Sequence, residues 1–248
     1  KLLAGSAEML NSAFKQIADD KSSDILLISG DVTNNGELTA HDEFISMLRS
    51  LKKKKKKVFV ITATHDFRGS GETDAYDGDN VIKTPTATRD MLFDMYREFG
   101  PDEAYSIHES SFSYCLDLDE KTRCLMLNDI FRNEEALGDK SATYSPSCLR
   151  WIKQMHDEAK RDGKYIFICS HHPFIPAVPA YRIGAGKENR NMRSPVVGHM
   201  LADMGFDLVF TGHSHFCDVG YLRSDNGNLI WDITTPSVRF YPPAYREI

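Results

Sequence analysis

The sequence predicts an α/β fold, and three observations support this prediction. Stretches with apolar residues at helical spacing alternate along the chain with short, unbroken apolar runs. Unbroken runs of this kind are typical of parallel strands that are buried on both faces of a sheet. Several runs end directly in Asp or His residues, at the end of a strand where open α/β sheets bind their ligands.

The first part of the chain contains two helix–strand pairs. Apolar residues three and four positions apart predict a helix over residues 2–19, and residues 24–29 are expected to form a buried strand. A second helix is expected to begin near a capping box formed by Thr39 and Asp42, and residues 58–61 form the next buried strand. The order helix, strand, helix, strand indicates an α/β topology.

Two stretches beside these elements lack apolar periodicity. Six consecutive lysines occupy residues 52–57, at the end of the second helix. Lysines at a helix C-terminus complement the helix dipole, so we expect them to be solvated, and the alternative is that they bind an anionic partner. Residues 67–87 are rich in Gly, Asp and Thr and are expected to form a long functional or mobile loop.

The remaining elements combine antiparallel strands with further helix–strand pairs. Antiparallel strands are expected at residues 112–118, 123–128, 216–222 and 229–233. Helices are expected at residues 91–99, after Ser145-Pro146 and after Ser194-Pro195, because Ser followed by Pro is typical of a helix start. Buried strands are expected at residues 164–169 and 207–210, and a second long loop, which is suited to contact a substrate, lies between Pro173 and Arg193.

Composition limits the class of protein. The 248 residues are 41% apolar, and we expect a single domain over residues 1–248. The net charge of −6 gives no overall attraction for nucleic acid, and no apolar run reaches the roughly 18 residues of a membrane span. Five cysteines without CxxC spacing indicate neither a disulfide framework nor a zinc ribbon, although Cys115 and Cys124 could face each other across a hairpin.

Four expected strand ends carry residues that can bind a metal ion or take part in catalysis. They are Asp31, His65-Asp66, His171-His172, and the pair His213 and His215. These groups can converge because ligands lie beyond the carboxyl ends of strands in such sheets. His213 and His215 point the same way if their segment stays extended. Carboxylate and imidazole together suit zinc, iron or manganese better than magnesium or calcium.

The order of these motifs resembles that of the calcineurin-like metallophosphoesterases over nearly the whole chain. Residues 30–36 (GDVTNNG) are similar to the motif whose Asp, here Asp31, bridges two metal ions. His171 resembles the lone histidine ligand of the family, and His213 and His215 resemble the Gly-His-x-His pair that divides between the two ions. His65-Asp66 resembles the end of the Gly-Asn-His-Asp motif, in which the His acts on the leaving group and the Asp orients it.

This resemblance implies a fold, cofactors and an activity. The fold would be a four-layer αββα sandwich of two mixed sheets flanked by helices. Two divalent metal ions, Mn, Fe or Zn, would activate a water molecule that attacks a small phosphorylated substrate, a phosphomonoester or a phosphodiester. His65 would be the general acid. Arg190, Asn191 or Asn189 could hold the phosphoryl group, an assignment based on the composition of their loop.

The sequence departs from the family pattern at two places. The family begins with a strand ending in Asp-x-His, and we expect the given chain to start after that motif, so that the domain is incomplete at its N-terminus and the first metal keeps only Asp31 and His215. Ala63-Thr64 stands where the family has Gly-Asn, and Thr64 is a poorer metal ligand than the Asn amide. These departures predict weakened metal occupancy and reduced turnover. The alternative function is a weakened or non-catalytic family member that acts as a binding scaffold.

Each candidate residue also has a structural interpretation without function. Gly-Asp after a strand is often an ordinary turn, and a lone His171 or His213 is more often a core or surface histidine. His172 could serve only to support His171 through its backbone. The other histidines, His41, His108, His156 and His199, are expected to have no partners and no function. Only the coincidence of the whole set favours a metal site.

Overall fold

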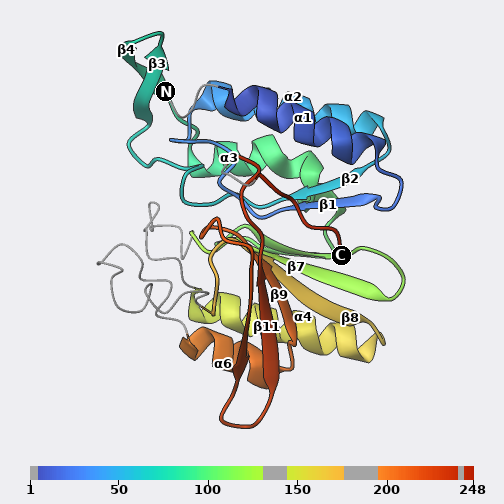
Figure 1. Ribbon diagram of the computed structural model, residues 1–248. Helices are drawn as coiled ribbons and strands as arrows, with labels where there is room; N and C mark the ends of the chain where they lie inside the picture. The colour runs from blue at the N-terminus through green and yellow to red at the C-terminus, as the bar shows by residue number, and fades with distance from the viewer. Residues whose placement is uncertain (1–4, 131–143, 176–194, 240–242) are drawn as a thin grey trace.

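The chain folds into four layers, two of helices and two of strands (Figure 1). The computed structural model describes residues 5–130, 144–175, 195–239 and 243–248. One outer layer contains α1 (Ser6–Asp19), α2 (Leu38–Lys53) and α3 (Arg89–Tyr96), and the other contains α4 (Pro146–Arg161) and α6 (Pro195–Met204). The predicted αββα sandwich is thereby confirmed, and no helix in the described ranges has the length and apolar character to cross a membrane.

The two inner layers are sheets of different size. The smaller sheet consists, in the described residues, of β1 (Ile25–Ile28) and β2 (Lys57–Val60), which are parallel rather than mixed. The larger sheet has the order β10-β11-β9-β8-β7-β6-β5 and is mixed, with β7, β8, β9 and β11 parallel to one another. Its strands are β5 (Ser106–His108), β6 (Ser113–Asp117), β7 (Thr122–Leu127), β8 (Tyr165–Ser170), β9 (Leu208–Thr211), β10 (Asp218–Arg223) and β11 (Leu229–Thr234).

Strand alternation divides the core into three parts. On β2, Val58 and Val60 pack against the helices α1–α3, whereas Phe59 and the next residue after the strand, Ile61, pack against the larger sheet. On β8, the residues at even positions face α4 and α6, and Phe167 faces the smaller sheet. Successive side chains of a strand point to opposite faces, so strands with two apolar faces are buried on both sides, as the unbroken apolar runs predicted.

Helix boundaries agree with most of the expected signals. Ser145 accepts a hydrogen bond from the backbone N–H of Cys148, which is the N-cap expected before Pro146. The predicted capping box of α2 is wrong, because the helix begins at Leu38 with Glu37 at the N-cap position, and Thr39 lies inside the first turn. After α3 the chain continues through the 3₁₀ turns η1 (Arg97–Phe99) and η2 (Pro101–Glu103).

The expectation of an irregular loop at residues 67–87 is wrong. The segment at residues 67–87 contains a hairpin, β3 (Glu72–Asp77) paired with β4 (Asn80–Pro85), that projects from the body of the protein (Figure 1). Its strands are largely exposed on both faces, so the sequence carries no alternation of apolar residues. The lysine run is largely solvated, as expected, because Lys53, Lys54, Lys55 and Lys57 are exposed. Lys56 is the exception in the run: it is buried and its Nζ donates to the carbonyl oxygens of Asp20 and Ser23.

Cys115 and Cys124 do not face each other. The pairing of β6 with β7 places Cys115 opposite Leu125 and Leu116 opposite Cys124. Because neighbouring positions point to opposite faces, Cys115 packs towards α4 and Cys124 packs towards the smaller sheet. Both cysteines are buried free thiols.

Candidate metal centre

Five strands bring polar side chains to one edge of the sandwich. The chain leaves β1, β2, β7, β8 and β9 through segments that contain Asp31, His65, Asp129, His171 and His213, respectively. The sequence reasoning anticipated four of these strand ends and missed that of β7. It treated β7 as an antiparallel strand only, whereas β7 also pairs in parallel with β8 and therefore ends at the same edge. An acidic residue directly after a buried strand, as at Asp31, was the signal that could have identified Asp129.

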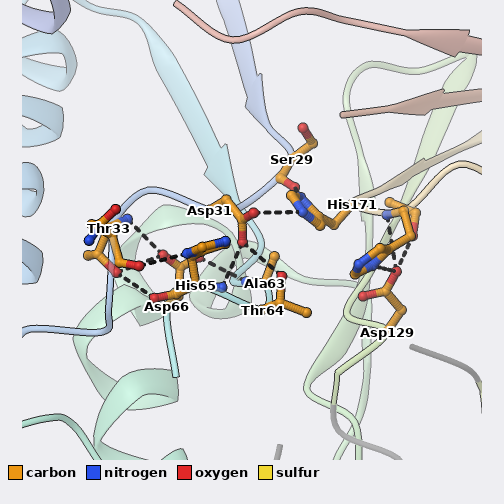
Figure 2. A network of polar contacts seen from close by, with 12 residues as sticks. Ser29, Asp31, Thr33, Ala63, Thr64, His65, Asp66, Asp129 and His171 are labelled. Carbon is orange, nitrogen blue, oxygen red and sulfur yellow. Dashed lines mark hydrogen bonds and ion pairs between the residues drawn. The ribbon is translucent and has the colours of Figure 1, made fainter. Parts of the chain in front are cut away.

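Asp31 lies at the centre of this edge (Figure 2). Its Oδ1 accepts a hydrogen bond from the backbone N–H of His65 at 2.8 Å and one from the Thr64 hydroxyl at 3.3 Å. Its Oδ2 lies 3.0 Å from Nε2 of His171. The backbone of Asp31 has a φ of 55°, in the left-handed region that few non-glycine residues adopt. This strained turn directs the carboxylate between the two sheets.

His171 is held in one orientation. Its Nδ1 lies 2.7 Å from the carbonyl oxygen of Ser29, and because a carbonyl oxygen only accepts, Nδ1 must carry the proton. Nε2 is then directed at Asp31. Burial lowers the pKa of His171, but the Asp31 carboxylate outweighs burial and raises that pKa to about 9. Burial raises the pKa of Asp31 in turn, and His171 outweighs it and holds that pKa well below its ordinary value.

His171, His172 and His213 form a compact imidazole cluster. One ring nitrogen from each of the three lies within 4.8 Å of those of the other two. The ring centroids of His171 and His213 are 5.2 Å apart, and those of His172 and His213 are 4.2 Å apart. Burial and the two neighbouring imidazoles lower the pKa of His213 to about 3. A neutral imidazole has a free lone pair, which a metal ligand requires.

The segment that carries His213 and His215 is not extended, contrary to the expectation. The backbone N–H of Ser214 donates to the carbonyl oxygen of Gly212 at 2.6 Å, and His213 has a φ of 59°, so these residues form a γ-turn. His215 also has a positive φ, 60°, and is exposed. It is not part of the three-imidazole cluster. Asp31, His171 and His65 act on it electrostatically, which places it near the same edge.

His172 makes a contact of its own rather than only supporting His171. Its Nδ1 lies 2.9 Å from Oδ2 of Asp129, and its backbone N–H donates to the same oxygen at 3.2 Å. Burial raises the pKa of Asp129, but the neighbouring His172 and His171 outweigh burial and lower it overall. Asp129 is therefore a buried carboxylate that flanks the imidazole cluster on the side opposite Asp31 (Figure 2).

His65 and Asp66 follow β2. The resemblance implies that Asp66 orients His65, but the Asp66 carboxylate does not contact the His65 ring. The His65 Nδ1 donates to the carbonyl oxygen of Asn34 at 2.6 Å, and the ring is exposed. The Asp66 carboxylate is buried and accepts hydrogen bonds from the backbone N–H groups of Thr33 and Ala63, both at 2.8 Å. Asp66 thus joins the turns after β1 and β2 (Figure 2) and orients His65 through the backbone, not through its ring.

His41 is a supporting residue that the sequence reasoning missed. It was expected to have no partner, but it is fully buried, with Nδ1 2.8 Å from the Tyr96 hydroxyl and Nε2 2.9 Å from the Asp66 carbonyl oxygen. His41 lies within the apolar stripe of α2, and the sequence around it gives no indication of these two hydrogen bonds. The predicted substrate-binding residues Arg190 and Asn191, and with them Asn189, lie outside the described residues.

The donor set fits a divalent transition-metal ion. Carboxylate and imidazole donors converge at this edge. The backbone carbonyl of Ser29 fixes Nδ1 of His171, and the Asp129 carboxylate fixes Nδ1 of His172. Such outer hydrogen bonds orient metal-binding histidines and set their tautomer. Asp129 Oδ1 has no hydrogen-bond partner among the described residues, although it is buried. A cation near this oxygen would compensate the buried carboxylate.

A sequence model of the calcineurin-like phosphoesterases matches residues 3–217. The chain belongs to the calcineurin-like phosphoesterase family. As a member of this family it is a phosphoric ester hydrolase with divalent metal cofactors. A comparison with curated protein sequences found no match.

Two solved structures resemble this calcineurin-like phosphoesterase. A dimetal phosphatase from Danio rerio is 17% identical with a TM-score of 0.60, and the match covers 97% of this chain and 80% of the other. A purple acid phosphatase from yellow lupin (Lupinus luteus) seeds is 13% identical with a TM-score of 0.46, and the match covers 92% of this chain and 39% of the other. At this identity, the first likeness supports the fold alone.

Proposed function

We propose that the chain hydrolyses a small phosphomonoester or phosphodiester at the edge formed by Asp31 and the imidazole cluster, with His65 as general acid. The observation that carries the proposal is the ion pair of Asp31 with His171, which joins the turn after β1 to the end of β8. The proposed metal-binding residues are Asp31, Thr64, His171, His213 and His215. Bound divalent ions, Mn, Fe or Zn, would supply Lewis acidity that activates water and holds phosphate oxygens.

His65 is placed to act on the leaving group. Its Nδ1 donates to Asn34, so Nε2 is the nitrogen left to face a substrate, and the exposed ring lies beside Asp31. Protonated Nε2 would give its proton to the departing alkoxide oxygen. Asp66 holds the turn that carries His65, and the backbone N–H of His65 is tied to Asp31. The acid is therefore fixed relative to the proposed metal ligands.

The leaving group provides the test of this role. A departing oxygen of low basicity, as in p-nitrophenyl phosphate, needs little protonation, whereas phenyl phosphate needs much more. We expect His65→Ala to reduce kcat for phenyl phosphate about 10²- to 10⁴-fold and to affect the p-nitrophenyl ester far less. The assay contains manganese. The corresponding diesters are assayed as well, and this shows whether the enzyme prefers phosphomonoesters or phosphodiesters. His199→Ala, on α6 across the larger sheet, is the control and is expected to behave as the wild type.

The outcomes separate the two candidate functions. An equal loss on both esters would contradict general acid catalysis by His65 but leave hydrolysis in place. The alternative, a weakened or non-catalytic scaffold, is suggested by the Thr64 hydroxyl, which donates to Asp31. In its non-catalytic form, that alternative predicts no metal-dependent turnover of any ester, in the wild type or in His65→Ala, and a weakened member would show low turnover.

A further inference from the structure

His172 and Asp129 form a buried pair beside the proposed centre. The His172 ring and the Asp129 carboxylate are both buried, and Nδ1 and Oδ2 are 2.9 Å apart. An ionised carboxylate only accepts hydrogen bonds, so Nδ1 of His172 carries the proton. In a neutral imidazole, Nε2 then has a free lone pair. Among the described residues, no hydrogen bond to this Nε2 is formed.

The pair lies within the imidazole cluster rather than apart from it. The rings of His171 and His172 meet edge to face, with centroids 4.7 Å apart, and His213 packs on His172 at 4.2 Å. A ring nitrogen from each lies within 4.8 Å of the other two. Two carboxylates, Asp31 and Asp129, flank the three rings, Asp31 at 3.0 Å from a ring nitrogen of His171 and Asp129 at 2.9 Å from one of His172.

The burial of Asp129 requires a compensating positive charge. A buried carboxylate is strongly disfavoured unless it is paired and hydrogen-bonded. The partners of its Oδ2 are His172 and the more distant Ser170 hydroxyl at 3.5 Å, and its Oδ1 has no hydrogen-bond partner in the described part of the chain. A cation bound through His172 would supply this charge. Carboxylate, imidazole and metal in this order is a recurring arrangement in metal sites.

We propose that His172, oriented by Asp129, is a metal ligand of this centre, so that one divalent ion is held by the three imidazoles of His171, His172 and His213. The inference rests on the proposed function in assuming that a metal ion binds at this edge. It adds a ligand to the set that the family resemblance implies. Asp129 acts through His172 and is a positioning residue.

Another histidine–aspartate pair provides a matched control. His156 on α4 is also buried, and its Nδ1 lies 3.4 Å from Oδ1 of Asp157. Its ring packs on Phe206, and it is not in the metal-binding cluster. His156→Gln therefore removes a buried, acid-paired imidazole outside the centre.

The test measures metal binding directly. Cobalt(II) titration, followed by visible absorption, gives the dissociation constant of the full chain, and zinc X-ray absorption gives the mean number of imidazoles per ion. We expect His172→Gln to weaken cobalt binding about 10- to 100-fold and to lower the imidazole number. Asp129→Asn should weaken binding by about tenfold with the imidazole number unchanged. His156→Gln should match the wild type in both measurements.

The possible results are distinguishable. If His171→Gln weakens binding but His172→Gln and Asp129→Asn bind cobalt as the wild type does, the inference is wrong and the proposed function stands. If the wild-type chain binds neither cobalt nor zinc, both are wrong. Circular dichroism establishes that each variant is folded. If His172→Gln does not fold, the cobalt affinity of Asp129→Asn decides the question. Unchanged affinity in that variant overturns the inference.

Discussion

His41 Nε2 donates a hydrogen bond to the backbone carbonyl oxygen of Asp66 at 2.9 Å. This bond fixes the tautomer, so Nδ1 of His41 accepts from the Tyr96 hydroxyl at 2.8 Å. Helices α2 and α3 are thereby joined to the residue whose carboxylate links the turns after β1 and β2. A histidine in the helical layer, away from the proposed metal ligands, thus supports the edge that we propose to be catalytic.

Replacement of His41 is expected to reduce the stability of the protein. His41→Ala leaves a cavity and two buried polar groups unpaired, which should cost about 2–5 kcal/mol in the free energy of unfolding. Tyr96→Phe removes only the bond to Nδ1 and should cost about 1–3 kcal/mol. Urea unfolding measures both values. A cost for His41→Ala no larger than that for Tyr96→Phe would contradict a structural role for the bond to Asp66.

Gly30→Ala is expected to disturb the turn that carries Asp31. Gly30 has a φ of +91°, and a Cβ there would lie 2.5 Å from the Cβ of Ala63. The left-handed conformation costs roughly 1–2 kcal/mol, and the clash adds about 1–3 kcal/mol. Gly71→Ala is the control, because Gly71 has a φ of +78° but no atom within 4 Å of the added Cβ. Urea unfolding should show the larger loss for Gly30→Ala, and equal losses would mean that the contact with Ala63 is unimportant.

Thr64→Asn is expected to strengthen metal binding. The Thr64 hydroxyl donates to Asp31 Oδ1 at 3.3 Å, so it occupies an oxygen of a proposed ligand. An amide oxygen at this position should tighten manganese binding by about tenfold, which corresponds to about 1.4 kcal/mol. Calorimetric titration with Mn²⁺ measures the change. Thr64→Val, of similar volume, removes the proposed hydroxyl ligand and should bind manganese more weakly than the wild type, and unchanged affinity in that variant would show that the hydroxyl does not coordinate.

The ion pairs of Arg123 predict a pH dependence of stability. Arg123 is 1% exposed, and its Nε lies 2.7 Å from Oδ1 of Asp117, which also pairs with Lys164. Burial raises the pKa of Asp117, but the hydrogen bonds from Arg123 and Lys164 outweigh it and hold that pKa below its ordinary value of 3.8. The unfolded chain therefore binds this proton more readily. The stabilisation is fully present above pH 3.8 and is lost as the pH falls through the lowered pKa.

Asp117→Asn is the variant that measures this contribution. Loss of a charged hydrogen bond should cost about 1.5–3 kcal/mol at pH 7. The difference from the wild type should shrink in acid, as chemical unfolding at a series of pH values would record. Asp94→Asn removes an exposed pair with Arg97 at 4.0 Å and should have little effect. A difference for Asp117→Asn that is the same at pH 7 and in strong acid would contradict the assignment.

The family and most elements could be predicted from the sequence because their signals are local. The unbroken apolar runs predicted β1, β2, β8 and β9, since a strand buried on both faces has apolar side chains at every position. Motif residues such as Asp31 and His171 follow directly at strand ends. The hairpin β3–β4 was not predicted because both of its faces are largely exposed, so its strands show no alternation of apolar and polar residues.

The sequence by itself determined which residues end the strands, whereas only the tertiary structure decided which side chains meet. Asp129 pairs with His172 across 43 positions, and His41 reaches Asp66 across 25. Neither contact follows from spacing, because each depends on how two layers pack. The left-handed backbone at Asp31 likewise accompanies a contact with a separate turn, because the Asp31 carboxylate accepts a hydrogen bond from the backbone N–H of His65.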